Sequence, residues 1–101
     1  MPAVIERYVF LRLKPEHATE QSRTDVRARA ATLAQIPGVL ALTIGEPADP
    51  SARGAWDLSL TARFDSLAAV ERYLEHPAHA AYFDAFLAPR AAVIKAWNFE
   101  V

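Results

Sequence analysis

The chain has 101 residues, 52% of them hydrophobic, with a net charge of −1 from 11 basic and 12 acidic residues. This length predicts a single domain over residues 1–101, and the even spread of charge excludes the basic footprint of a protein that binds nucleic acid or an anionic membrane. Because the chain has no cysteine, disulfides, thiolate metal ligands and a cysteine nucleophile are excluded as well.

The N-terminal segment carries Glu6 and Arg7 and has no long apolar stretch, so we expect no signal peptide. No apolar run elsewhere approaches the roughly 20 residues that a membrane-spanning helix needs. From these two observations we expect a cytoplasmic protein with no membrane partner.

Residues 4–14, VIERYVFLRLK, predict the first strand, because β-branched and aromatic residues dominate the segment and prolines flank it. Side chains alternate along a strand, so both faces carry large apolar groups. One face has Ile5, Arg7, Val9, Leu11 and Leu13, and the other has Val4, Glu6, Tyr8, Phe10 and Arg12. Helices of this chain would cover the first face and a second subunit the other, which predicts a homodimer.

The middle of the chain predicts a helix, a short strand and a loop. The helix spans residues 19–35 and ends before Pro37-Gly38. Its apolar stripe consists of Val26, Ala30, Leu33 and Ala34. The strand spans 39–44, and residues 46–54 are expected to form an exposed loop because Pro, Asp, Ser and Gly dominate them.

Residues 56–64, WDLSLTARF, alternate between apolar and polar side chains more regularly than any other segment. This pattern predicts a half-buried antiparallel strand with one face against the helices. The side chains expected on that face are those of Trp56, Leu58, Leu60, Ala62 and Phe64.

The next segment combines titratable and aromatic residues. Ser66 is suited to cap a helix over residues 67–75, and His76-Pro77 is expected to break it, because the residue before proline is disfavoured in the α conformation. The inner face of this helix is expected to hold Leu67, Val70, Tyr73 and Leu74. Pro77 can start a second helical segment over 78–87. Its shared face comprises His79, Tyr82, Phe83, Phe86 and Leu87.

Residues 91–101 predict the last strand, so the order is strand, helix, strand, strand, helix, strand. This order predicts an α+β fold, the ferredoxin-like βαββαβ sandwich, with a four-stranded antiparallel sheet and helices on one face. The uncovered face of the sheet would pair with that of a second subunit.

Four segments carry a resemblance to a known family. They are VFLRLK at 9–14, IPGV at 36–39, WDLSLTARFDS at 56–66 and, most specific, YLEHPAH at 73–79. The chain resembles the stress-responsive A/B barrel family, known as Dabb domains, nearly from end to end. The resemblance implies a ferredoxin-like protomer that dimerises through its sheets into an α/β barrel, with a cavity between sheet and helices.

Most members of that family have no assigned reaction. One plant member is a polyketide cyclase that closes a linear poly-β-keto thioester without a cofactor, using histidines and a tyrosine in the cavity. The resemblance places its catalytic histidine on His79 and its tyrosine on Tyr73. A second family histidine falls on Arg7, whose guanidinium can hold an enolate or a carboxylate but cannot accept a proton near neutral pH.

Each of these residues also has a structural interpretation. His79 can act as a general acid or base, or it can stabilise the break at Pro77. Tyr73 can polarise a substrate carbonyl or simply pack in the core. Arg7 can bind an anion or pair with a carboxylate of this chain.

The leading hypothesis is a homodimer that binds an apolar, oxygenated keto or aromatic compound, with Tyr82, Phe83 and Phe86 lining the site. Catalysis would be cofactor-free cyclisation or isomerisation: His79 would remove a proton α to a carbonyl, and Tyr73 would donate to the enolate. Two alternatives stay open: a non-catalytic stress-response or interaction protein with a filled cavity, and a protein similar to cofactor-independent monooxygenases.

A metal site is not expected. His76 and His79 are separated by Pro77, which breaks the helix, and no cluster of further ligands lies nearby in the sequence. We therefore expect neither a metal nor a cofactor.

Overall fold

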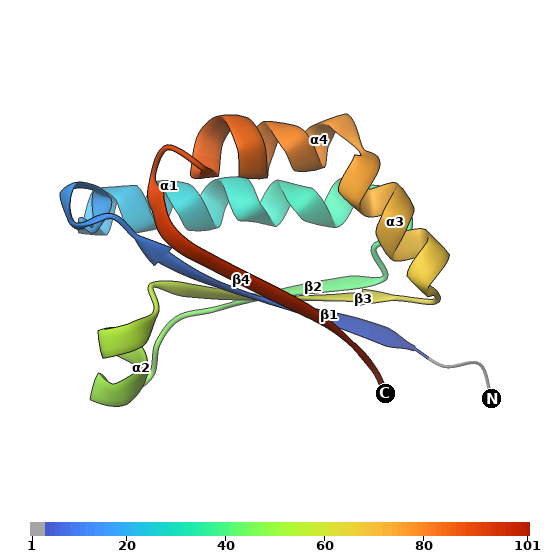
Figure 1. The fold of residues 1–101 in the computed structure, drawn as a ribbon, viewed down its shortest axis with the longest axis horizontal. Helices are drawn as coiled ribbons and strands as arrows, with labels where there is room; N and C mark the ends of the chain where they lie inside the picture. The colour runs from blue at the N-terminus through green and yellow to red at the C-terminus, as the bar shows by residue number, and fades with distance from the viewer. Residues whose placement is uncertain (1–3) are drawn as a thin grey trace.

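The computed structural model describes residues 4–101, so the first three residues of the predicted domain lie outside the described part. One four-stranded sheet carries a layer of helices on one face (Figure 1). The strands are β1 (Ile5–Leu13), β2 (Ala41–Gly45), β3 (Leu58–Phe64) and β4 (Ala91–Glu100). The helices are η1 (Pro15–His17), α1 (Glu20–Ala31), η2 (Thr32–Gln35), α2 (Pro50–Ala55), α3 (Leu67–Glu75), α4 (Pro77–Ala80) and η3 (Ala81–Leu87).

The sheet has the order β2-β3-β1-β4, and all three neighbouring pairs are antiparallel. Val9, in the middle of β1, lies opposite Leu60 of β3 and Ala96 of β4. This order, with α1 and α3 as the crossovers, is the predicted ferredoxin-like fold. The sequence prediction of the fold is confirmed.

The core lies between the sheet and the helix layer. Alternate residues of the two central strands supply its floor: Ile5, Val9, Leu11, Leu13, Leu58, Leu60, Ala62 and Phe64. The helices supply its roof: Val26, Ala30, Leu33, Ala69, Val70, Tyr73, Tyr82, Phe86 and Leu87. Within residues 4–101, no helix has both the length and the apolar composition needed to cross a membrane.

The helix boundaries follow local sequence signals. Thr19 caps α1 by accepting a hydrogen bond from the Ser22 amide, and Ser66 caps α3 by accepting one from the Ala69 amide. After η2 the chain turns at Gly38, whose φ of +96° is a conformation that suits glycine. Capping by Ser66 agrees with the sequence prediction.

Three details of the helix layer differ from the sequence prediction. Ala34 is exposed, because the chain tightens into the 3₁₀ helix η2 after Ala31 and the α-helical spacing ends there. Leu67 and Leu74 are 57% and 36% exposed, whereas Ala69 is buried in the inner face of α3. Of the four residues predicted on the inner face of α3, only Val70 and Tyr73 are buried.

The segment 46–54 is not simply a loop. Asp49 accepts a hydrogen bond from the Ala52 amide at 2.8 Å and Pro50 occupies the first turn, so α2 forms over the second half of the segment. Trp56 also differs from prediction. It follows α2 and packs on Phe10, at 5.5 Å between ring centroids, rather than on the core face of β3.

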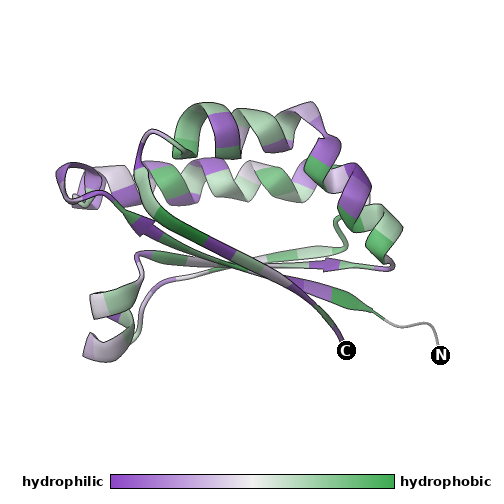
Figure 2. Cartoon of the chain, viewed as in Figure 1, coloured by the Kyte–Doolittle hydropathy of each residue, from purple (hydrophilic) through white to green (hydrophobic). Residues whose placement is uncertain are grey.

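The sheet face opposite the helices, which we call the open face, carries an aromatic cluster made of Tyr8, Phe10, Trp97 and Phe99. The rings of Tyr8 and Phe99 lie 5.6 Å apart, and those of Phe10 and Trp97 lie 6.4 Å apart. Trp97 and Phe99 are 51% and 53% exposed. Figure 2 shows that hydrophobic residues recur along β1 and β4 as well as along the helices. A hollow of about 490 Å³ is lined by this cluster together with Glu100 and Val101.

Candidate active site

The break between α3 and α4 places His79. His76 takes an extended conformation, with φ −67° and ψ 138°, and its Nδ1 accepts a hydrogen bond from the Ala78 amide at 3.1 Å. Pro77 begins α4 directly after it. The predicted break at His76-Pro77 is thus present, and it turns α4 so that His79 faces Tyr73 on the preceding helix.

After α4 the chain forms a π-helix, η3, where the sequence predicts an ordinary helical segment. The Ala88 amide donates to the Phe83 carbonyl five residues earlier, at 3.0 Å. The Tyr82 hydroxyl donates to the Val26 carbonyl of α1, also at 3.0 Å, which ties η3 to the helix beside it. π-Helical turns are rare and frequently lie at functional sites. Nothing in the side-chain periodicity distinguishes this turn from α-helix.

A chain of aromatic contacts leads from the sheet to His79. Phe64 of β3 contacts Tyr73 at 5.0 Å between ring centroids, and Tyr73 meets the His79 imidazole edge-on at 4.8 Å. Phe83 stacks on the other side of the imidazole at 4.5 Å. The His79 imidazole is therefore half-buried between a phenol and a phenyl ring.

Arg7 approaches this group from β1. It lies on the helix-facing side of the strand, is half-buried, and donates from Nη1 to the Asn98 side-chain oxygen at 3.0 Å. The three ion pairs found within residues 4–101 do not include it. Its partner is thus an amide of β4 and not a carboxylate, so its positive charge is not neutralised in this part of the chain.

The surroundings of these side chains shift their pKa values. Burial raises the pKa of Tyr73 to about 12, although the nearby Arg7 opposes the shift. Burial also lowers the pKa of His79, and Arg7 lowers it further, while Asp84 acts in the opposite direction. At neutral pH the imidazole is therefore uncharged and able to accept a proton, and the phenol is a hydrogen-bond donor.

The charge of Arg7 gives a direct test of this geometry. In the Arg7→Gln variant the positive charge that disfavours the imidazolium is gone, so the pKa of His79 should rise. The measurement is an NMR titration of the histidine ring protons, with the His79 signal assigned from its loss in His79→Gln. Arg72→Gln, which removes an exposed arginine of α3, is the control and should leave the titration unchanged. An unchanged midpoint in Arg7→Gln would contradict the proximity of the two groups.

The other predicted residues, Tyr82 and Phe86, have other partners. Tyr82 is buried, its hydroxyl is occupied by Val26, and burial raises its pKa. Phe86 lies between the guanidinium groups of Arg29 and Arg90, which are 4.3 and 4.2 Å from its ring centre. The structure therefore brings together His79, Tyr73, Phe83 and Arg7, while Tyr82 contacts α1 and Phe86 contacts α1 and Arg90, which follows η3.

Asn98 is the residue of this group that the sequence reasoning missed. It lies directly opposite Arg7 in the β1–β4 register, so both side chains project from the same side of the sheet. Because side chains alternate along a strand, its position between Trp97 and Phe99 indicates that Asn98 lies on the face opposite these two residues. The sequence does not give the register of β4 against β1, so it could not pair Asn98 with Arg7.

Comparison with solved structures shows the same fold in several proteins. A dimeric ferredoxin-like protein of unknown function from Thermobifida fusca shares 24% identity and a TM-score of 0.84, over 100% of this chain and 93% of its own. A hydroxynitrile lyase from Passiflora edulis shares 20% identity and a TM-score of 0.81, over 100% and 95% of the two chains. A Dabb family protein with a ferredoxin-like fold from Mesorhizobium loti shares 20% identity and a TM-score of 0.79, over 96% and 95%.

The sequence itself gives a family. No curated protein matches it. However, the family model of the stress responsive A/B barrel domain, Dabb, matches residues 5–101. That match spans all four strands and every helix described above, including the break at Pro77. The chain therefore belongs to the Dabb, or stress responsive A/B barrel domain, family.

Proposed function

We propose that this Dabb protein is a homodimer that binds an apolar, oxygenated small molecule beside His79, Tyr73 and Arg7. The observation that carries the ligand site is the contact between the Tyr73 and His79 rings, 4.8 Å apart, next to a half-buried guanidinium that no carboxylate neutralises within residues 4–101. The neutral imidazole can accept a proton, the phenol of Tyr73 can donate a hydrogen bond, and Arg7 supplies a positive charge. Together these three groups suit a ligand that carries a carbonyl oxygen.

The dimer is supported by the open face. A cluster of four large aromatic side chains on a sheet, two of them about half exposed, is typical of a surface that another protein covers. The relative from Thermobifida fusca, which has the same fold, is described as dimeric. The occupant we propose is a second copy of this chain, open face against open face.

The reaction that this group supports is cofactor-free proton transfer. His79 takes the proton from the carbon α to a ketone, so that the C–H electron pair moves into an enolate. Tyr73 donates a hydrogen bond to the enolate oxygen, and the charge of Arg7 stabilises it. The enolate carbon then attacks a second carbonyl of the same molecule, and the alkoxide that forms takes the proton back from the His79 imidazolium, which gives cyclisation. Alternatively, the imidazolium returns the proton to another carbon of the conjugated enolate, which gives isomerisation. That a relative with this fold is a lyase supports the capacity of the fold for catalysis.

A second candidate function is favoured by Phe83. Its ring stacks on His79 at 4.5 Å and is half-buried, so it occupies the space beside the imidazole. If this stack persists in solution, the cavity is filled by the protein's own side chains. The protein would then act in a stress response through a protein partner and not through a small ligand.

A thermal-shift screen separates the two functions. Wild type, His79→Gln and Tyr73→Phe are tested against aromatic, β-keto and short acyl compounds, with His17→Gln as the matched control in η1. A compound at 100 times its dissociation constant adds about 2.7 kcal/mol of stability, which raises the melting temperature by several degrees for a domain of this size. We expect a shift in wild type and His17→Gln that is reduced in His79→Gln, and turnover assays then follow with the same variants.

Phe83→Ala completes the design. If no compound shifts wild type but the same compounds shift Phe83→Ala, the side chain of Phe83 fills the site and the second function is favoured. If compounds shift wild type and His79→Gln equally, the proposed ligand site is wrong.

A further inference from the structure

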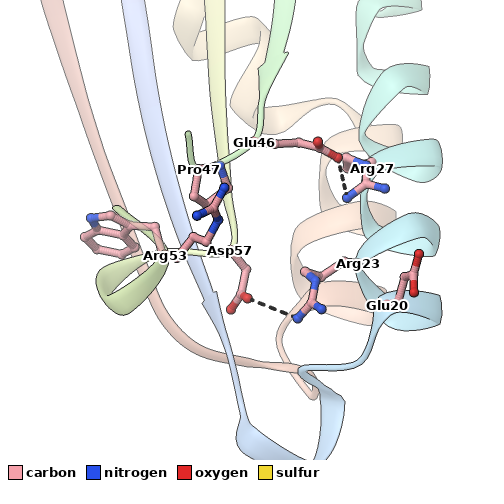
Figure 3. Close-up of a pocket in the computed structure, with 8 residues that line it drawn as sticks. Glu20, Arg23, Arg27, Glu46, Pro47, Arg53 and Asp57 are labelled. Carbon is pink, nitrogen blue, oxygen red and sulfur yellow. Dashed lines mark ion pairs between the residues drawn. The ribbon is translucent and has the colours of Figure 1, made fainter. Parts of the chain in front are cut away.

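A second cavity, of about 470 Å³, lies away from the group around His79. Its lining comes from α1, the connection between β2 and α2, α2 itself, and the connection between α2 and β3, toward the end of the sheet that carries α2 (Figures 1 and 3). None of its lining residues belongs to the His79 group. Its charged residues are Glu20, Arg23, Arg27, Glu46, Arg53 and Asp57.

Two ion pairs cross from α1 to the sheet side of this cavity (Figure 3). Arg27 pairs with Glu46 at 2.8 Å, and Arg23 pairs with Asp57 at 3.6 Å. Asp57 is fixed from behind, because its second carboxylate oxygen accepts a hydrogen bond from the Leu13 amide at 2.8 Å. The side chain of Asp57 is 18% exposed and that of Glu46 is 61% exposed. The Arg23 pair is thus held in place, and the Arg27 pair faces solvent.

The guanidinium groups retain hydrogen-bonding capacity toward the cavity. Arg23 uses Nη1 for the Ala18 carbonyl at 3.0 Å, and Arg27 uses Nη2 for the Thr24 hydroxyl at 3.4 Å. Each guanidinium has five N–H donors, so both keep several that these partners do not use. The side chain of Arg53 makes no hydrogen bond or ion pair within residues 4–101.

We propose that this cavity is a binding site for a small molecule that carries an oxyanion, either a carboxylate or a phosphate group. The oxyanion lies between Arg53 and the two arginines of α1, because guanidinium groups bind such oxygens in a planar, two-pronged geometry. The remainder of the molecule packs on Pro47 and Trp56, the uncharged part of the lining. The volume falls in the range of small-molecule sites.

The carboxylate of Glu46 is the group that the ligand replaces. An ion pair between exposed side chains contributes little to stability, so exchanging Glu46 for a ligand oxygen on Arg27 has a small cost. Asp57 stays with Arg23 and the Leu13 amide, and it holds that guanidinium at the edge of the site. This site takes a charged ligand, whereas the His79 group is built for an apolar one, so the two proposals stand independently.

The test is an NMR titration of the full chain at constant ionic strength, with inorganic phosphate and benzoate as separate probes. The resonances followed are the Trp56 indole N–H and the backbone amides of α2. We expect saturable shifts with at least one probe, and an affinity reduced roughly tenfold or more in Arg53→Gln, as for loss of a charged hydrogen bond. Arg72→Gln removes an equivalent exposed charge from α3 and should bind as wild type does.

Each outcome decides the proposal. Saturation by phosphate or by benzoate, dependent on Arg53, supports the site and identifies the oxyanion as phosphate or carboxylate. Shifts that grow without saturation, that are the same in Arg53→Gln, or that are confined to residues around Tyr73 and His79 would overturn it.

Discussion

The Leu33→Ala variant is expected to lower the free energy of unfolding by about 2–5 kcal/mol, the range for removing a buried leucine side chain. Leu33 is 0% exposed and lies in η2, where the helix layer meets the sheet. Its loss leaves a cavity in the core between the helix layer and the sheet. The measurement is urea unfolding followed by circular dichroism at a fixed protein concentration, because a dimer would make stability depend on concentration.

The matched control is Leu67→Ala. This variant removes the same atoms from a leucine in a helix, but the side chain of Leu67 is 57% exposed. Its effect should stay within about 0.5 kcal/mol, as is usual for surface substitutions. Equal losses in the two variants would mean that Leu67 is covered in solution, for instance by a partner, and that the assignment of the core is incomplete.

The Trp97→Glu variant is expected to convert the proposed dimer into a monomer at micromolar concentration. Trp97 is 51% exposed in the isolated chain and lies in the aromatic cluster of the open face. In a two-fold dimer each substitution acts twice, so two carboxylates would enter an apolar interface without partners, at a cost of several kcal/mol. Sedimentation equilibrium of wild type and variant gives the masses directly.

Leu67→Glu is the control for this experiment. It introduces the same charge at a leucine of similar exposure on α3, in the helix layer on the other side of the sheet. The variant should retain the wild-type mass. If wild type is itself monomeric, or if Leu67→Glu dissociates and Trp97→Glu does not, the open face is not the dimer interface.

Much of the fold was predictable because its signals are local. The alternation of Leu58, Leu60, Ala62 and Phe64 defines the buried face of β3, and Ser66 and Pro77 determine where helices begin. These signals act through backbone preferences and side-chain periodicity, which the sequence displays directly. The order of elements then leaves few topologies.

The sequence predictions were wrong where two local signals favour different structures, or where contacts between distant elements determine which side chain is buried. The Asp49-Pro50 pair is a helix-start signal, but the high content of Pro, Ser and Gly in 46–54 favoured a loop. In α3, Leu67 and Leu74 have the spacing of an inner face, yet in the folded chain Ala69 is buried and they are exposed. Trp56 continues the strand alternation in sequence but follows α2 in space, which directs its ring to Phe10.

The candidate site was predictable only in part for the same reason. Tyr73 and His79 lie six residues apart on either side of a proline, so their proximity follows from a single break in one helix. Arg7 could be placed on the correct side of β1 by alternation. Its amide partner, Asn98, is 91 residues away, and only the strand register brings the two together.

The π-helix η3 gives its segment a residue to spare. A π-helical turn, with hydrogen bonds between residues five apart, holds about one residue more than an α-helical turn. Deleting one exposed residue of η3, such as Ala85, would therefore let the turn close to α-helical hydrogen bonding while Phe86 and Leu87 keep their places in the core. The same deletion in the α-helix α1 would rotate every residue after it by about 100°, so single-residue deletions should be tolerated better in η3 than in α1.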